Sequence, residues 1–239
     1  MSLPPDLVLH ADDAIVVINK PAGMLSLRDG YDQTLPHVAT ILAPEFGRIW
    51  MVHRLDRETS GVMVVARTAQ AHHALNDQFR DRRVTKLYHC LVWGSPEWDE
   101  KELEVPLRKD GDRQHRSTVD PRGKPSSTSF KVLERYREIS LVQASPHTGY
   151  THQIRAHLAY LGFPIAGDAL YRGPHRPDPG ELSPRSMPPG IERVALHALS
   201  IQFIHPLSQA TVSFSAPYSG DFAAALQALK ASCQPPSGG

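Results

Sequence analysis

The sequence has few cysteines, no long hydrophobic run and almost no net charge. Its two cysteines, Cys90 and Cys233, are far apart and form no CxxC pair, which argues against a disulfide framework and a thiolate metal site. No apolar run approaches the roughly 20 residues that span a bilayer. The N-terminus also lacks the basic and apolar regions of a signal peptide. We therefore expect a cytoplasmic protein that does not bind membranes.

An excess of charge of one sign is also missing. The 26 basic and 25 acidic residues leave a net charge of +1, which is not the strongly basic profile of many nucleic-acid binders. Basic residues do cluster at 80–86 and 107–116, but on charge alone such clusters are more typical of a solvated face. GxGxxG, P-loop and GxSxG motifs are absent, so the sequence indicates neither a nucleotide cofactor nor a hydrolase nucleophile elbow.

Hydropathy patterning predicts many short strands and few helices. There is no internal repeat and no alternation of strands with helices that would indicate βαβ units. The pattern therefore predicts an α+β fold, with a mixed, mainly antiparallel β-sheet and flanking helices and loops. The expected strands lie at 7–19 (a pair), 48–52, 62–66, 84–94, 129–136, 139–146, 193–206 and 210–218, and the expected helices at 69–83, 151–162 and 220–231.

We expect one domain over residues 1–222, followed by a closing helix and flexible tail over 223–239. Residues 95–127 are polar and rich in turn formers, which predicts a short peripheral hairpin and a loop. Residues 172–190 contain six prolines and three glycines. That composition predicts a surface loop inserted into the domain, not a boundary between domains.

The string HRLDRETSG at 53–61 places one carboxylate, Asp56, between Arg54 and Arg57, in a turn between two expected strands. Such an aspartate often only caps its turn and pairs with a neighbouring cation. A nearby guanidinium can also hold it ionised by lowering its pKa by about 1–3 units, so that it can act as a nucleophile or base at neutral pH. The residues alone leave both interpretations open.

The string HTGYTHQIRAH at 147–157 concentrates histidine and arginine where an expected strand meets an expected helix. Its histidines recur every five residues, whereas a zinc site on a helix needs i, i+4 spacing, so we expect no metal. Arg155 lies near the start of the helix, where it could reach a cleft or extend along the helix edge. Tyr88, on the strand at 84–94, could be an ordinary half-buried strand residue or a platform for a nucleobase.

Taken in order, five strings resemble the RluA family of RNA pseudouridine synthases. The resemblance runs from about residue 6 to residue 222, and the HRLDxxTSG and THQIRxHL strings at this separation are specific to the family. It implies the pseudouridine synthase catalytic fold and the isomerisation of specific uridines in RNA, without a metal or a cofactor. The strings are NKPAG (19–23), HRLDRETSGVMVVART (53–68), KLYHCLVWG (86–94), TGYTHQIRAHLAYLGFPIAGDALY (148–171) and LHALSIQFIHP (196–206).

The resemblance implies catalytic roles for three residues. Asp56 matches the aspartate that attacks or deprotonates the nucleoside as the glycosidic bond breaks, and Arg155 matches the basic partner of that aspartate. Tyr88 matches the tyrosine that stacks on the target uracil. An enzyme of this kind must take the base out of its stack, which costs a few kcal/mol and less in loops and at ends.

Five further residues are expected to bind the substrate. Arg54 matches the arginine that helps to hold the target nucleotide out of the RNA helix, and Ile154 matches an apolar residue of the pocket. His53, Thr59 and Lys86 lie in the same matching strings and are expected to contact the substrate. The implied partner is a stem-loop of ribosomal RNA, transfer RNA or both, bound by a monomer.

Two positions depart from the family pattern. Tyr150 stands where many members have arginine, and Phe163 stands where histidine is frequent. A phosphate contact or the choice of substrate beside the pocket is therefore expected to differ. Some members carry an extra N-terminal RNA-binding domain, but here the first matching strand begins within about ten residues, so we expect the catalytic domain alone. Affinity for RNA would then come from the local basic clusters and weaken with salt.

Other functions stay open on sequence alone. A non-catalytic RNA-binding protein could use the same fold, because a fold does not establish an activity. A glycosylase that flips a uridine would instead release free uracil and leave an abasic site. A metal hydrolase is a third alternative.

Overall fold

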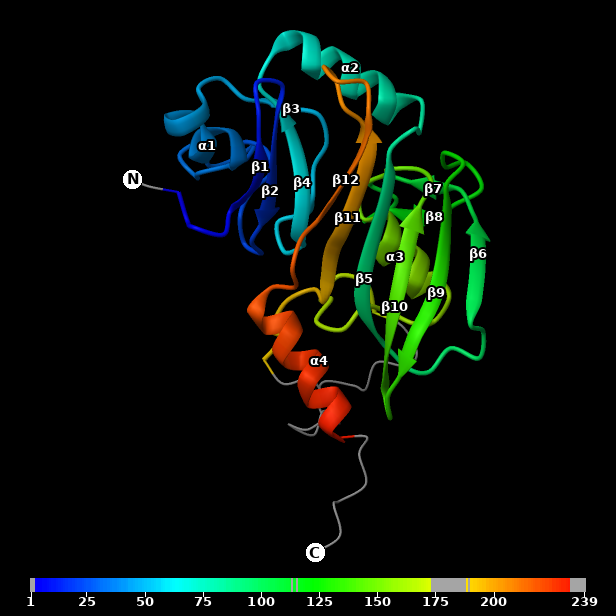
Figure 1. Ribbon diagram of the computed structural model, residues 1–239. Helices are drawn as coiled ribbons and strands as arrows, with labels where there is room; N and C mark the ends of the chain where they lie inside the picture. Colours follow the sequence, from blue (N-terminus) through cyan, green and yellow to red (C-terminus); the bar gives the residue numbers. More distant parts are fainter. Residues whose placement is uncertain (1–2, 113, 115, 173–187, 189, 233–239) are drawn as a thin grey trace, which may run out of the picture. The chain divides into compact units, whose positions relative to one another are not determined.

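The computed structural model describes residues 3–112, 114, 116–172, 188 and 190–232 (Figure 1). Most of the predicted loop at 172–190, and the last seven residues of the predicted closing helix and tail at 223–239, lie outside these residues. The chain divides into two compact units, which we call the first unit (1–87 and 198–218) and the second unit (88–197 and 219–239). Strands β5 (Thr85–Trp93) and β11 (Leu196–Ile204) each contain a point at which the chain passes from one unit to the other.

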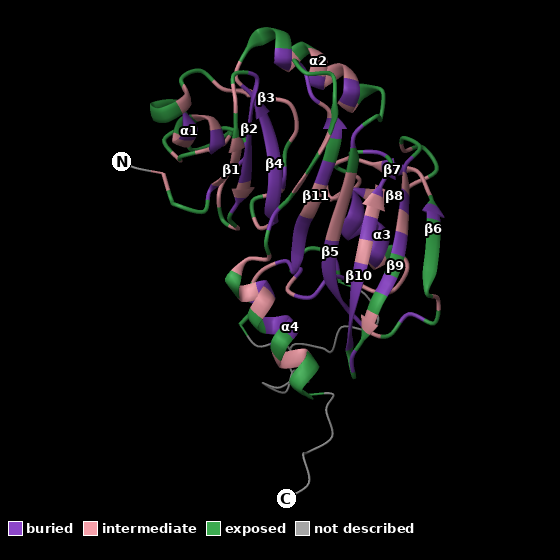
Figure 2. Ribbon diagram, in the orientation of Figure 1, coloured by how far each residue is buried: buried purple, intermediate pink, exposed green. Residues whose placement is uncertain are grey.

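The first unit contains antiparallel strand pairs around one fully buried strand. β4 pairs with both β2 and the short β3, and every residue of β4 is buried (Figure 2). An unbroken apolar run, VMVVA, predicts such a strand. β2 also pairs with β1, and β11 pairs with β12. The strands are β1 (Val8–Ala11), β2 (Ile15–Lys20), β3 (Trp50–Met51), β4 (Ser60–Ala66) and β12 (Thr211–Ser215).

Helices α1 (Val38–Phe46) and α2 (Ala69–Arg80) complete the first unit. The Thr68 hydroxyl caps α2 by accepting a hydrogen bond from a backbone N–H of the first turn. α2 is shorter than the predicted helix because the chain turns at Arg82, whose φ is +58°. The sequence pattern does not predict α1, because Pro44 lies inside it. Pro44 has no N–H to donate to the carbonyl four residues earlier, and the helix ends two residues later, at Phe46.

The second unit contains four antiparallel strands in the order β5, β10, β9, β6. The predicted pairing of 129–136 with 139–146 is confirmed. The prediction for 95–127 is only partly right. β7 and β8 form a separate two-stranded hairpin, but β6 pairs with β9 as an exposed, charged edge strand (Figure 2). The strands are β6 (Glu100–Glu104), β7 (Leu107–Arg108), β8 (Thr118–Val119), β9 (Ser127–Arg135) and β10 (Ile139–Pro146).

Helices α3 (Gln153–Tyr160) and α4 (Gly220–Ser232) belong to the second unit. α3 contacts β8 and β10. It begins two residues later than predicted because His152 takes a left-handed conformation, with φ +54°. Gly162, the predicted stop, has φ +88° just beyond its end. The predominance of antiparallel strands with few helices confirms the predicted α+β fold.

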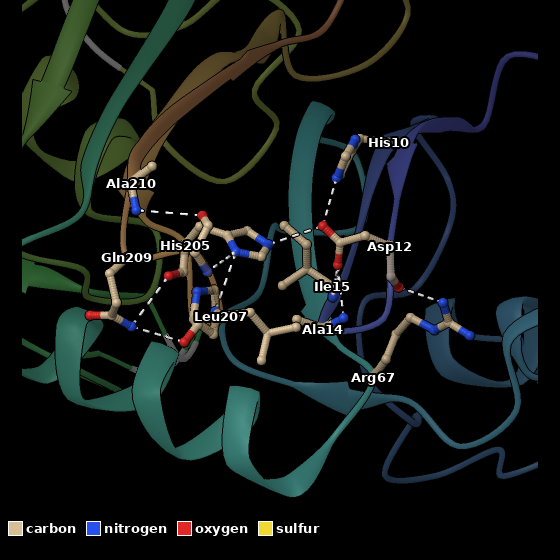
Figure 3. A network of polar contacts seen from close by, with 11 residues as sticks. His10, Asp12, Ala14, Ile15, Arg67, His205, Leu207, Gln209 and Ala210 are labelled. Atoms are coloured by element: carbon tan, nitrogen blue, oxygen red, sulfur yellow. Dashed lines mark hydrogen bonds and ion pairs between the residues drawn. The ribbon is translucent and has the colours of Figure 1, made fainter.

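A cluster of polar contacts centred on Asp12 joins two turns of the first unit (Figure 3). One carboxylate oxygen accepts hydrogen bonds from the N–H groups of Ala14 and Ile15, at 2.8 and 2.9 Å. The other lies 2.9 Å from Nε2 of His10 and 3.0 Å from Nε2 of His205. Nδ1 of His205 accepts two backbone N–H groups of its own turn, which places its ring proton on Nε2. Partial burial raises the pKa of Asp12, but hydrogen bonds from His10 and the backbone lower it to about 2.

Asp12→Asn is expected to lower the free energy of unfolding by about 1–2 kcal/mol at pH 7, because the charged acceptor of four hydrogen bonds is lost. A carboxylate with a lowered pKa stabilises the fold above its unfolded pKa. The difference between wild type and variant should therefore shrink as the pH falls from about 4 to about 2. Urea denaturation across this range measures it. The control is Asp13→Asn, an exposed neighbour, and equal effects of the two substitutions would contradict the prediction.

Candidate active site

Asp56 lies in the loop between β3 and β4, where its backbone carbonyl accepts a hydrogen bond from the Thr59 N–H at 3.1 Å and closes a tight turn. The turn predicted between two strands is therefore present. Asp56 is half-buried and Thr59 is buried, whereas Arg54 and Arg57 are exposed. The loop thus places one carboxylate between two solvent-accessible guanidinium groups.

A buried lysine fixes this loop through hydrogen bonds to backbone carbonyls. Lys20, at the end of β2, is fully buried, and its ammonium donates hydrogen bonds to three backbone carbonyls. The acceptors are Pro21 at 3.0 Å, Met24 at 2.9 Å and Arg57 at 3.2 Å. One ammonium therefore ties the KPAG turn to the residue that follows Asp56. Sequence reasoning assigned no role to Lys20, although its string belongs to the family resemblance.

Further contacts join the same two segments. The Gly23 N–H donates to the Arg57 carbonyl at 2.8 Å, and Nε of Arg57 donates back to the Gly23 carbonyl at 3.2 Å. The Ser26 hydroxyl donates to the Leu55 carbonyl at 2.6 Å and accepts the Leu55 N–H at 3.1 Å. Residues on both sides of Asp56 are thus fixed by the segment 20–26, and Arg57 is one of the fixing groups.

His53 fixes the start of the loop. Its Nε2 accepts the Val64 N–H at 3.1 Å, and its ring stacks on Phe79 with centroids 4.8 Å apart. Burial, and then the positive charge of Lys86, lower the pKa of His53 to about 3, so the ring stays neutral. Burial also lowers the pKa of Lys86, to about 8. His53 is therefore a neutral ring fixed between β4 and α2, and its expected contact with the substrate stays a prediction.

The backbone at Gly61, the last residue of the Thr-Ser-Gly turn, requires a glycine. Its φ is +115°, and a Cβ atom at this position would lie 2.2 Å from the carbonyl oxygen of Ala198. Any side chain would force the start of β4 away from that backbone.

Arg155 lies on α3 in the second unit and is buried, which excludes the alternative that it extends along the helix edge into solvent. Its Nε and Nη2 atoms contact Oδ2 and Oδ1 of Asp168, at 2.7 and 2.9 Å. Its guanidinium lies 5.0 Å from the ring centre of Tyr171. The neighbouring Ile154 is buried, and Tyr88 is half-buried on β5, opposite Ala144 of β10. Sequence reasoning missed Asp168.

A buried chain of hydrogen bonds fixes α3 on either side of Arg155. Nε2 of His157 lies 3.0 Å from the Ser126 hydroxyl, which itself donates to the Val105 carbonyl at 2.6 Å. Nδ1 of His157 lies 2.9 Å from the Thr128 hydroxyl, which accepts a hydrogen bond from the Gln153 amide at 2.9 Å. These contacts fit a neutral His157 that donates from Nε2 to Ser126 and accepts the Thr128 hydroxyl at Nδ1. Burial correspondingly lowers the pKa of His157 to about 4.

The neutral His157 predicts a specific dependence of stability on pH. An unfolded histidine takes up a proton near pH 6.5, whereas folded His157 stays neutral until about pH 4. Its contribution to stability is therefore present above about pH 6.5 and lost as the pH falls toward 4, by roughly 3 kcal/mol over the window. Chemical denaturation at pH 7 and pH 4.5 should show a smaller loss in His157→Gln than in the wild type. His147→Gln, at an exposed histidine, should lose as much as the wild type; matching losses in all three proteins would contradict the prediction.

The structure thus brings the predicted site residues into two groups. Four of them, His53, Arg54, Asp56 and Thr59, share one loop of the first unit. Lys86 belongs to the same unit but lies on β5. The second unit holds the other three, Tyr88, Ile154 and Arg155, of which the last two are adjacent on α3. The pairing of Asp56 with a basic partner in the second unit stays a prediction.

Each of the two basic clusters contains an arginine that is paired with nearby carboxylates. In the first, Arg80 contacts Asp77 and Asp81, at 2.7 and 3.0 Å. In the second, Arg116 contacts Asp112 at 2.6 Å. Part of the positive charge of each cluster is therefore balanced locally.

The part of the chain that the structure describes has neither a candidate metal cluster nor a candidate membrane-spanning helix. No group of three or more histidine, cysteine, aspartate or glutamate side chains there is placed to hold a metal ion. Among the same residues, no helix combines the length and the apolar character needed to cross a membrane. Cys90 is a buried free cysteine whose Sγ donates to the Val142 carbonyl at 3.4 Å.

Comparison with known proteins shows that the chain is similar to members of one family. The model of the RNA pseudouridylate synthase family matches residues 14–160. Ribosomal large subunit pseudouridine synthase C of Vibrio cholerae is 38% identical over 225 residues, which cover 93% of this chain and 69% of that protein. The dual-specificity RNA pseudouridine synthase RluA of Pasteurella multocida is 39% identical over 212 residues, covering 88% and 92%.

A solved structure agrees with these relatives. Human RNA pseudouridylate synthase domain containing 4 superposes with a TM-score of 0.75 and 25% identity, over 93% of this chain and 92% of that one. The predicted pseudouridine synthase fold is confirmed. The chain belongs to the RluA family and is an RNA pseudouridine synthase, an isomerase.

Proposed function

We propose that this enzyme converts uridine in a stem-loop of large-subunit ribosomal RNA to pseudouridine, as a monomer in the cytoplasm. Several relatives are named as ribosomal large subunit pseudouridine synthases, which supports ribosomal RNA as the substrate. In this proposal Asp56 acts as the nucleophile or base on a uridine flipped out of its helix. Modification of transfer RNA instead of ribosomal RNA would change the proposed substrate.

The observation that carries the proposal is the fixed position of the Asp56 turn. Lys20, Ser26 and Gly23 hold the backbone on both sides of Asp56 through side-chain and backbone hydrogen bonds. A carboxylate that only balanced local charge would not need such anchoring. A group that must meet one atom of a substrate does, because a misplacement of about 1 Å can reduce the rate by about 10²-fold.

The reaction changes no oxidation state and needs no co-reactant. The bond between C1′ of the ribose and N1 of uracil breaks, the uracil turns while it is held, and a bond forms between C1′ and C5. The hydrogen on C5 leaves to water, and N1 takes up a proton. Asp56 assists the cleavage as nucleophile or base, and Arg155 supplies its basic partner.

Other residues in the proposal hold the flipped nucleotide. Tyr88 offers an aromatic face on which uracil can stack, and Ile154 an apolar wall. Arg54 is exposed beside the Asp56 turn and can occupy the space that the uridine leaves. Thr59, on the same loop, and Lys86, on β5, complete the proposed substrate contacts. The basic clusters at 80–86 and 107–116 should add little affinity, because cations already paired with carboxylates release fewer counterions from RNA.

Tritium release tests the proposal. The protein is incubated with RNA labelled with tritium on C5 of uridine, taken from a strain that lacks the gene and therefore keeps its target uridines unmodified. Ribosomal and transfer RNA are assayed separately, and the products are digested to nucleosides. The proposal predicts tritium in water and pseudouridine in large-subunit ribosomal RNA.

The other outcomes are distinct. Release from transfer RNA alone would overturn ribosomal RNA as the substrate. Free uracil with an abasic site would indicate a glycosylase. RNA binding by folded protein without tritium release from either RNA would indicate a non-catalytic RNA-binding protein.

A further inference from the structure

Arg155 is held by an aspartate other than Asp56. The contact between Arg155 and Asp168 is bidentate, at 2.7 and 2.9 Å, and both side chains are buried, with relative exposures of 7% and 0%. A guanidinium has five N–H donors in one plane, of which this contact uses two. A bidentate carboxylate therefore fixes the plane of the guanidinium as well as its position.

Asp168 is itself fixed by the backbone. Its Oδ1 accepts the N–H groups of Leu170 and Tyr171, at 2.9 and 3.0 Å, so the carboxylate cannot rotate without breaking them. The preceding residue, Gly167, has φ +76°, and a Cβ atom there would lie 1.9 Å from the carbonyl oxygen of Arg193. Only glycine allows the chain to bring Asp168 to this place.

Tyr171 holds the face of the same guanidinium. Its ring centre lies 5.0 Å from the Arg155 guanidinium carbon. Its hydroxyl accepts the Ser117 N–H at 2.8 Å and lies 3.2 Å from Nδ1 of His152. Arg155 is thus held at one edge by Asp168 and on one face by Tyr171, on a helix whose backbone is fixed by Gln153 and His157.

We propose that Asp168 is a positioning residue for catalysis. It fixes the Arg155 guanidinium so that the N–H groups outside the Asp168 contact keep a single direction. A buried ion pair adds little net stability compared with an apolar pair, so orientation is the effect that this arrangement can supply. The inference rests on the proposed role of Arg155 and deepens it: Asp168 acts through Arg155 and does not touch the RNA.

The chain offers a matched control for this proposal. Arg193 and Asp221 form a second bidentate pair in the same unit, with contacts of 2.6 and 3.0 Å through the same guanidinium atoms. Asp168→Asn and Asp221→Asn therefore remove the same kind of charged contact. Asparagine at position 168 can still accept the N–H groups of Leu170 and Tyr171.

Steady-state tritium release and thermal unfolding are measured for both variants. Asp168→Asn is expected to lower kcat by about 10²-fold, with KM within about threefold of the wild type, because the RNA still binds but the charge is misplaced. Asp221→Asn should lower Tm by a smaller amount, because the Asp221 carboxylate is 31% exposed, and should leave kcat within about threefold of the wild type. Equal effects of the two variants on kcat would show a purely structural role and overturn the proposal.

A double variant gives a second test. Because Asp168 acts through Arg155, Arg155→Ala with Asp168→Asn should be no slower than Arg155→Ala alone. A further tenfold loss in the double variant would overturn the proposal. Should Asp168→Asn fail to fold, Asp168→Glu keeps the charge but moves the carboxylate by one methylene. It should show the same loss of kcat at unchanged KM, and wild-type kcat would overturn the proposal.

Failure of the proposed function gives a different result. Full turnover by Arg155→Ala would remove the role of Arg155 itself. Loss of turnover in Arg155→Ala with normal turnover in folded Asp168→Asn would leave that role intact and overturn only the inference on Asp168.

Discussion

Asp56→Asn is expected to fold as the wild type does and to release no tritium from C5-labelled RNA. Asparagine keeps the size of aspartate and its ability to accept hydrogen bonds, and the anchors at Lys20 and Ser26 act on neighbouring backbone atoms, so the turn should persist. What is lost is the ionised carboxylate, without which no nucleophile or base remains in the proposed reaction. The rate should fall by at least roughly 10⁴-fold.

The matched control is Glu58→Gln, two residues along the same turn. It also removes one half-buried carboxylate, which lies 4.0 Å from Arg57. Near-normal turnover is expected, because Glu58 takes no part in the proposed reaction. RNA binding by Asp56→Asn should stay within about threefold of the wild type, because the charge acts mainly on the bond-breaking step. Turnover by Asp56→Asn within tenfold of the wild type would remove Asp56 from the mechanism.

Arg155→Ala is expected to lose both activity and stability. The rate should fall by about 10²–10³-fold, because a preorganised positive charge is removed from the proposed site. The free energy of unfolding should fall by about 3–5 kcal/mol, because Asp168 is left as a buried carboxylate without its guanidinium. Tritium release and urea denaturation measure the two effects.

The two effects of Arg155→Ala can be separated. Adding Asp168→Asn replaces the buried, unpaired carboxylate by a neutral amide that can still accept the two backbone N–H groups. The double variant should therefore have a higher free energy of unfolding than Arg155→Ala alone. Its activity should not recover. Recovery of turnover together with stability would mean that Arg155 serves only the fold.

The sequence predicts the strands better than the helix ends, for physical reasons. Buried strands such as β4 carry short, unbroken apolar runs, and such a run in a sequence indicates a buried strand. Helix boundaries depend on single backbone conformations, such as the left-handed His152 and Arg82, which no apolar pattern encodes. The sequence does not predict α1, because it contains Pro44 and a proline inside a short segment normally argues against a helix.

Among the site residues, the sequence indicates those that stand in motifs but not those that support them. Asp56, Arg155 and Tyr88 could be proposed because they stand in recognisable strings. Their supports could not, because a support depends on contacts between distant residues. Lys20 reaches a carbonyl 37 positions away, and Asp168 lies 13 positions from its arginine. Nothing in the local pattern of either residue indicates which group it meets once the chain has folded.

The buried ammonium of Lys20 has a consequence for the thermodynamics of RNA binding. Fixing the backbone of a flexible residue costs about 1–2 kcal/mol in conformational entropy, so ordering a loose loop on binding would weaken affinity by several kcal/mol. Here the loop is ordered before RNA arrives, by contacts internal to the first unit. More of the interaction free energy with RNA is then available to unstack the target uridine.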